Sequence, residues 1–206
     1  MFTNPHARYW NRFVDADGAW KRDPRTAVEQ RPPGEDLAAL RSGLGQPAGS
    51  VPAMWPFYTC VVDEKAAQRD EGSDEETAEH AALALFGLHQ QSQQEPMHRP
   101  KVGFGQALRA LRLSDRFSEN AVDARVQAAA TATSVPALLY RLRGLITQLR
   151  TIHQPLDYDL LMEDIKYWHY VESRQRVRRA WGLRYYVWGQ AASDGSEGKD
   201  TTPATF

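Results

Sequence analysis

The sequence predicts an all-α protein built from two small helical-bundle lobes. Apolar residues recur every three or four positions along most of the chain, as they do on one face of an α-helix. No segment shows the clear apolar–polar alternation that is typical of a β-strand. Proline, glycine and polar residues separate the periodic segments, and 42% of the residues are hydrophobic, which is sufficient for a folded core.

Residues 1–98 are expected to form the N-terminal lobe. Residues 4–33 mix aromatic and charged side chains with prolines, so we expect one short helix followed by a loop. Leucines three or four positions apart predict an amphipathic helix over residues 35–44, which glycine can end. The apolar segment 51–62 predicts a helix with a first turn broken by proline. The acidic segment 63–76 is interpreted as a loop that leads into the next helix.

That next helix is expected to run to about His89, because glutamates in its first turns stabilise the helix dipole and apolar residues follow at helical spacing. The segment after it, residues 90–100, is rich in glutamine and contains two prolines. We interpret this segment as the Gln/Pro-containing loop that joins the two lobes.

Residues 99–188 are expected to form the C-terminal lobe. Ser118, Ser134 and Asp157 each precede an apolar periodic segment and can cap a helix. The glycines of residues 102–106 are interpreted as the lead-in to a helix. The predicted helices of this lobe cover residues 105–113, 118–129, 134–152, 157–168 and 174–188. Residues 189–206, rich in small and polar residues, are expected to be a disordered tail.

The charge is distributed unevenly although the net charge is only −1. Residues 1–98 carry 9 Lys+Arg and 15 Asp+Glu, a net charge of −6, whereas residues 99–188 carry 15 and 8, a net charge of +7. Arginines make up 20 of the 25 basic residues, and the planar guanidinium group is suited to binding phosphate. This distribution of charge therefore predicts a positive face on the C-terminal lobe. The alternative, that these arginines only form solvated helix faces, stays open at this point.

A dense cluster of four arginines lies within residues 174–179. On a helix they form two rows on either side of Val177 and Trp181, which are expected to face the core. Like charges at this density repel one another, and a bound polyanion would relieve the repulsion. A solvated helix end stabilised by the helix dipole is the alternative. The two rows are Arg174 with Arg178 and Arg176 with Arg179.

Motifs for catalysis, metal binding or a phosphate loop are not recognisable. Cys60 is the only cysteine, and His80 and His89 are nine residues apart, on opposite sides of a helix. Gly103 and Gly105 lack the following Lys-Ser/Thr of a P-loop, and no Gly-x-Ser-x-Gly elbow occurs. We therefore predict no catalytic residue, no metal and no cofactor. No run of about 18 apolar residues and no signal-peptide pattern is found, so we expect a cytoplasmic protein without a membrane partner.

Five separated segments resemble one known family in the right order. Residues 37–45 resemble its early Ala-Leu-Arg-Arg-Gly-type segment, residues 85–90 its Leu-Phe-Ala-Leu-His helix, and residues 102–109 its Ser-Leu-Gly-x-Ala-Leu-Arg lead-in. Residues 155–168 resemble its pattern Leu-Asp-Trp-x-x-Leu-Leu-x-Asp-Leu-x-x-Trp, and residues 177–186 its Arg-Arg-x-Trp-Ala-x-x-Tyr-Tyr ending. The family is CasB, the small subunit of the type I-E CRISPR Cascade complex.

This sequence departs from the CasB pattern at Tyr158, where tryptophan is usual, in the order of Gly103 and Phe104, and in its long N-terminus. The resemblance implies a non-catalytic, two-lobed helical protein that is present twice in the complex. Its implied partners are the backbone and large Cascade subunits, a second copy of itself, the guide RNA and the target DNA, including the displaced single strand. The implied function is to hold nucleic-acid backbones and to stabilise the R-loop between guide RNA and target DNA.

By this resemblance, contact with nucleic acid is assigned to basic residues of the C-terminal lobe. A helical adaptor whose basic face binds an acidic protein is the alternative that the residues leave open. The first-rank residues are Arg109, Arg125, Arg141, Arg143, Lys166, Arg174, Arg176, Arg178, Arg179 and Arg184. The second-rank residues are Arg41, Arg99 and Lys101.

Overall fold

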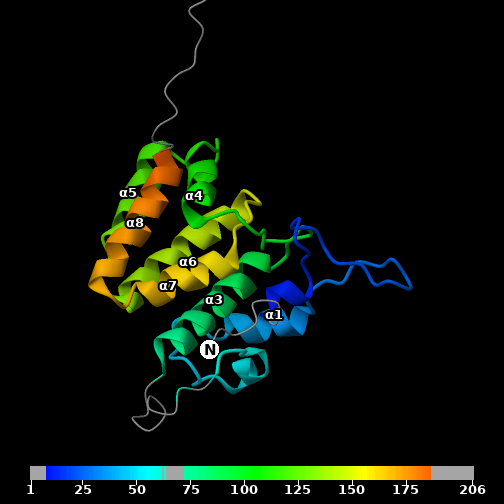
Figure 1. Cartoon of the computed structure of the whole chain (residues 1–206). Coiled ribbons are helices and arrows are strands. Elements are labelled where there is room, and N and C mark those ends of the chain that lie inside the picture. Colours follow the sequence, from blue (N-terminus) through cyan, green and yellow to red (C-terminus); the bar gives the residue numbers. More distant parts are fainter. Residues whose placement is uncertain (1–7, 62, 64–71, 187–206) are drawn as a thin grey trace, which may run out of the picture.

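The structure, a computed structural model, describes residues 8–61, 63 and 72–186, and this region of the chain is helical (Figure 1). The predicted all-α fold class is confirmed. The predicted disordered tail lies outside the described residues. The elements are η2 (Trp10–Arg12), α1 (Gly34–Arg41), η3 (Pro52–Phe57), α3 (Asp74–Gln90), α4 (Phe104–Arg112), α5 (Glu119–Ala130), α6 (Val135–Thr151), α7 (Tyr158–Tyr167) and α8 (Val171–Tyr186).

Side-chain caps explain where several helices begin. Ser73 and Glu76 form a reciprocal capping box at the start of α3. The hydroxyl of Ser134 accepts a hydrogen bond from the backbone N–H of Ala137, and Asp157 accepts two from the first turn of α7. Ser118 occupies the cap position of α5 without a side-chain hydrogen bond. The sequence therefore predicts where α5, α6 and α7 begin, whereas α8 begins at Val171, three residues before the predicted start.

Two N-terminal segments differ from a regular α-helix. Residues 52–57 form a 3₁₀-helix that ends before the extended residue Tyr58, whereas the sequence predicted a longer helix over residues 51–62. Pro52 and Pro56 lack the N–H that an α-helical ladder requires, which explains the short element. After η2, two isolated antiparallel bridges join Val14 to Trp20 and Arg22 to Glu29. Residues 14–29, which contain these two bridges, form an arm that projects from the body, drawn in blue (Figure 1).

Helix α3 lies at the centre of the packing, because it contacts α1, α6 and α7 (Figure 1). Phe86 on α3 packs edge-on against Tyr158 of α7, with ring centroids 5.2 Å apart, and Trp10 packs 5.9 Å from Phe86. The buried apolar side chains on both sides of residue 98 belong to one cluster. The two-lobed division at that residue stays a prediction.

Helices α4, α5 and α8 lie together at one end of the molecule, and the arm lies at the other (Figure 1). The contact of α4 with α8 is close enough to involve backbone. A Cβ atom at Gly105 would lie 2.4 Å from the carbonyl oxygen of Trp181. Phe104 packs against the Trp181 ring at 4.9 Å, so the Gly-x-Gly segment predicted as a helix lead-in brings α4 onto α8.

No helix within the described ranges is both long and apolar enough to cross a lipid bilayer.

Replacing Gly105 with alanine should destabilise the fold, because the added methyl group must push α4 away from α8. The expected loss is about 1 to 3 kcal/mol, seen as a lower Tm in thermal denaturation. Gly182→Ala is the matched control, since a Cβ atom there meets nothing within 4 Å and alanine favours a helix. Equal melting temperatures for the two variants would contradict this account of the α4–α8 contact.

Candidate nucleic-acid interface

Helix α8 packs on an apolar seam formed by Val177, Trp181 and Tyr185, which are all buried. The sequence predicts the burial of Val177 and Trp181 but not that of Tyr185. Trp181 stacks on Trp168 at a centroid distance of 5.3 Å, and its indole N–H donates to a carboxylate oxygen of Asp164 at 2.7 Å. Because the seam fixes the rotation of α8, it also fixes which way each arginine row of this helix points.

The row of Arg174 and Arg178 is used inside the protein. The Arg174 guanidinium donates to the carbonyl oxygens of Trp168 and Thr133, each at 2.5 Å. Arg178 donates to the carbonyl of Ala132 at 3.1 Å and lies 5.4 Å from the Trp168 ring centroid. These two arginines therefore join α8 to the end of α7 and to the α5–α6 loop, where basic groups suit the unpaired carbonyls of a helix end.

The other row is exposed. Arg176 lies over the ring of Tyr167 at 4.8 Å, while Arg179 points to solvent. Arg184 on α8 and Arg109 on α4 are exposed too. Within the described region of the chain, no hydrogen bond or ion pair to the guanidinium of these four arginines is formed. Their donors are available to a ligand, in contrast to those of the first row.

Lys166 differs from these arginines because it has an acidic partner. Its ammonium group lies 3.1 Å from a carboxylate oxygen of Glu75, and both side chains are half-buried. The pair connects α7 with the first turn of α3. A phosphate that bound Lys166 would have to compete with this carboxylate.

Three predicted residues come together in a groove of about 630 Å³ between α5 and α6. They are Arg125 on α5 and Arg141 and Arg143 on α6, and all three are exposed. The other first-rank residues do not line this groove, which we call the α5–α6 groove. Its remaining lining residues are Ala124, Ala128, Tyr140, Gly144, Leu145, Thr147 and Gln148.

Tyr140 is a candidate that the sequence analysis missed. Its side chain is 74% exposed, and the Arg141 guanidinium lies 5.6 Å from its ring centroid. A signal was present in the sequence, because Tyr140 falls two residues after Leu138 and so lies off the apolar stripe of α6.

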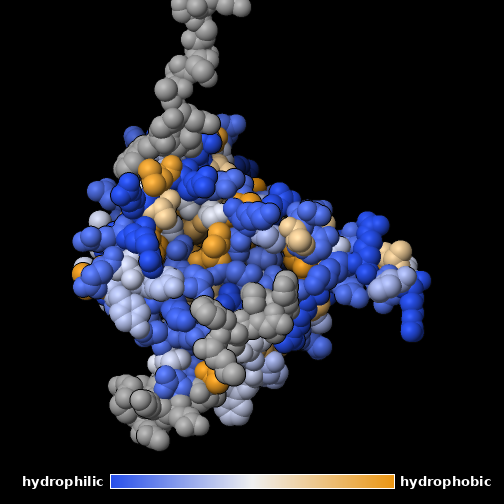
Figure 2. Space-filling model, in the orientation of Figure 1, coloured by the Kyte–Doolittle hydropathy of each residue, from blue (hydrophilic) through white to orange (hydrophobic). Residues whose placement is uncertain are grey.

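The second-rank residues occupy other places. Arg41 is half-buried at the end of α1, and Arg99 is exposed but packs beside Gly18 of the arm. Lys101 is exposed, and its backbone N–H donates to Asp157 at 2.7 Å. None of the three lines the α5–α6 groove. On the face shown in Figure 2, hydrophilic side chains dominate and apolar ones form small patches.

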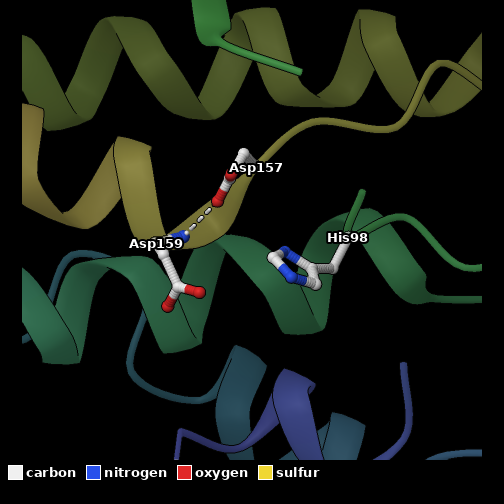
Figure 3. A group of neighbouring side chains, drawn as sticks. All are labelled: His98, Asp157 and Asp159. Atoms are coloured by element: carbon white, nitrogen blue, oxygen red, sulfur yellow. Dashed lines mark hydrogen bonds between the residues drawn. The ribbon is translucent and has the colours of Figure 1, made fainter. Parts of the chain in front are cut away.

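His98, Asp157 and Asp159 converge at the start of α7 (Figure 3), with one potential metal-ligand atom from each within 4.8 Å of the others. The ring of His98 is not available to a cation. Its Nδ1 accepts the backbone N–H of Tyr158 at 3.1 Å, so the proton of the neutral ring lies on Nε2. Burial lowers the pKa of His98, although the two carboxylates oppose the shift.

Both carboxylates of this cluster are already bonded to N–H groups. Asp157 accepts the backbone N–H groups of Lys101, Asp159 and Leu160. Asp159 accepts hydrogen bonds from the side chains of Arg8, Trp10 and Asn11 at 2.9 to 3.0 Å. The cluster is therefore a structural junction that attaches residues 8–11 to α7, a role that the sequence analysis did not predict.

The Asp164–Trp181 contact predicts a pH dependence of stability. Burial raises the pKa of Asp164 from 3.8 to about 7, although the hydrogen bond from Trp181 opposes the shift. Between these values the folded chain holds a proton that the unfolded chain has released, so stability falls as the pH rises through this window. Asp164→Asn keeps an acceptor for Trp181 and removes the buried charge. Its Tm should exceed that of the wild type by several degrees more at about pH 8 than at about pH 5.

Glu172→Gln, at an exposed position of α8, is the control with the same change in charge and should show no such trend. An Asp164→Asn effect that is equal at the two pH values would contradict the raised pKa.

Residues 36–186 match the family model of CRISPR-associated protein Cse2. Among solved structures, CasB from Thermobifida fusca is 31% identical, with a TM-score of 0.58 over 74% of this chain and 84% of that chain. CasB from Thermus thermophilus is 23% identical, with a TM-score of 0.54 over 74% and 86%. A chain of a CRISPR RNA-guided surveillance complex is 22% identical, with a TM-score of 0.54 over 74% and 82%. Comparison with curated protein sequences finds no match.

The matched region begins inside α1 and ends with α8, so it contains every residue assigned to nucleic-acid contact. The arm and residues 8–13 precede it. The two structures below 25% identity support the fold, while the family model and the Thermobifida fusca structure also support the relationship in sequence. The chain belongs to the Cse2 (CasB) family of type I-E Cascade proteins.

Proposed function

We propose that this Cse2-family chain is the non-catalytic small subunit of a type I-E CRISPR RNA-guided surveillance complex. In this role it binds nucleic-acid backbone and stabilises the R-loop of guide RNA and target DNA during antiviral defence. The observation that carries the proposal is the set of exposed guanidinium groups on α4, α5, α6 and α8. Arg174 and Arg178, on the other row of α8, donate to backbone carbonyl oxygens and so have a role in packing. The exposed guanidinium groups do not have this role, so the packing of the chain does not explain them.

Phosphate contact explains this division of the arginines. An exposed guanidinium has five N–H donors in a planar fork that matches phosphate oxygens. Contacts of this kind are independent of base sequence, as required when guide pairing reads the sequence. Because unwinding of the target and pairing with the guide nearly balance, a few such contacts are sufficient to favour the opened state.

The proposed partners are the backbone and large Cascade subunits, a second copy of this chain, the guide RNA and the target DNA, including the displaced strand. One of the similar structures is a chain of a CRISPR RNA-guided surveillance complex, which supports this assembly. We propose no catalytic role, since the His98 junction holds protein segments together. The complex is proposed to act in the cytoplasm.

Charge reversal of exposed arginines tests the proposal in the assembled complex. Arg141→Glu/Arg143→Glu and Arg176→Glu/Arg179→Glu should each weaken target DNA binding by roughly 10-fold or more at low salt. The difference from wild type should shrink as the salt concentration rises, with the log–log salt slope reduced by about 1 to 2. Binding can be measured by electrophoretic mobility shift over a series of salt concentrations.

Arg22→Glu/Arg25→Glu in the arm changes the charge equally at exposed positions and is the control, with a smaller expected effect. Wild-type target binding at low salt by both test variants would refute the proposal. If the basic face instead bound an acidic protein, the arginine variants would lose binding of that protein and keep binding of target DNA. Target binding by the variants therefore separates the adaptor function from the proposed one.

A further inference from the structure

We propose that the α5–α6 groove binds one unpaired nucleotide, with its base stacked on Tyr140 and its phosphate held by the adjacent arginines. This inference rests on the proposed function and specifies its ligand as single-stranded nucleic acid. Three features of the groove support it: an aromatic ring without a structural role, space on an apolar floor, and unpaired positive charge around it.

Tyr140 is the most exposed of the large apolar side chains among the described residues, at 74%. Other exposed tyrosines have evident partners: the Tyr170 hydroxyl donates to Asp74 at 2.7 Å, and Tyr186 packs against Tyr185 and Arg112. Among the described residues, the Tyr140 hydroxyl forms no hydrogen bond, and the one cation–π or ring–ring contact of its side chain is with the Arg141 guanidinium. A ring in this state offers a free face to a planar ligand.

The floor of the groove provides space beside this ring. Ala124, Ala128 and Gly144 are small, and Leu145 adds an apolar side chain. A Cβ atom at Gly144 would meet nothing within 4 Å, so the groove is open above this position. The volume of about 630 Å³ falls within the range of small-molecule sites, which run from roughly 300 to 1,000 Å³.

The charge around the groove suits a phosphodiester. Arg125 approaches from α5, while Arg141 and Arg143 approach from α6, so one bound phosphate can be reached from two helices. Arg143 and Tyr140 also line a second hollow of about 660 Å³, which extends toward α3 and the Gly43–Ala48 loop. A strand can therefore continue past the ring.

A single strand fits this arrangement better than a duplex. Bases in a duplex are stacked on one another and their faces are covered, whereas an unpaired base exposes a face to an aromatic side chain. Base–aromatic stacking tolerates any base, because every base has a π-face. The groove would thus hold a displaced strand without reading its sequence.

Binding of fluorescent oligonucleotides to the purified full chain tests the inference. The probes are an oligothymidylate, the same strand with abasic sites, and a blunt duplex of equal length. Tyr140→Ala should weaken binding of the oligothymidylate by roughly 5- to 100-fold, because stacking is lost. Tyr140→Ala should leave the affinities for the abasic strand and the duplex unchanged, and also the salt dependence of binding. Tyr140→Phe should bind all probes like the wild type. Tyr170→Ala, outside the groove, is the matched control.

Gly144→Leu provides a second variant that fills the groove without altering Tyr140 or any charge. It should show the same selective loss for the oligothymidylate, with a circular dichroism spectrum like that of the wild type.

The outcomes separate this inference from the proposed function. If Arg141→Glu/Arg143→Glu weakens binding but Tyr140→Ala binds all three probes like wild type, base stacking is overturned and the backbone contact stands. A loss that is equal for the oligothymidylate and the duplex also overturns the inference. If the wild-type chain binds no single strand, and the arginine variants leave the assembled complex unaffected, both proposals fail.

Discussion

Burial of the apolar seam of α8 determines how the C-terminal arginines are used. Trp181 lies between Phe104 of α4 and Trp168 at the end of α7, and the lack of a side chain at Gly105 lets the backbones of α4 and α8 approach. Since the seam prevents rotation of the helix, one row of arginines always faces carbonyl oxygens and the other always faces solvent. The packing of this seam therefore determines which guanidinium groups stabilise the fold and which are free for a ligand.

Because of this division, the positive charge of the C-terminal helices has two physical roles. Arg174 and Arg178 donate to backbone carbonyls of residues 132, 133 and 168, so their removal would take away hydrogen bonds that attach α8 to its neighbours. Arginines on the exposed helix faces contribute little to stability, because exposed charges are screened by water. They are therefore well suited to an interface whose strength depends on salt. The α5–α6 groove adds an aromatic ring to this charge, which would direct the interface toward unpaired nucleotides.

Local rules predict much of the fold and less of the site. Apolar spacing and the caps at Ser134 and Asp157 indicate the C-terminal helices, because these features act within one or two turns. The four arginines clustered in residues 174–179 look equivalent in the sequence, because the carbonyls of residues 132–133 that bind Arg174 and Arg178 are brought close only by tertiary packing. The Arg8–Asp159 bond joins positions 151 residues apart, and no local pattern indicates such a contact. The groove was missed for the same reason, as two helices are needed to form it.

The most direct test of the division is NMR of the arginine side chains in the ¹⁵N-labelled protein, before and after addition of single-stranded DNA. The account predicts that the N–H signals of Arg174 and Arg178 are protected from exchange in the free protein and stay unchanged on addition of DNA. The signals of the exposed arginines should shift with DNA and return as salt is added. The exposed arginines to follow are Arg109, Arg125, Arg141, Arg143, Arg176, Arg179 and Arg184. Equal responses from both groups, or shifts confined to Arg174 and Arg178, would contradict the account.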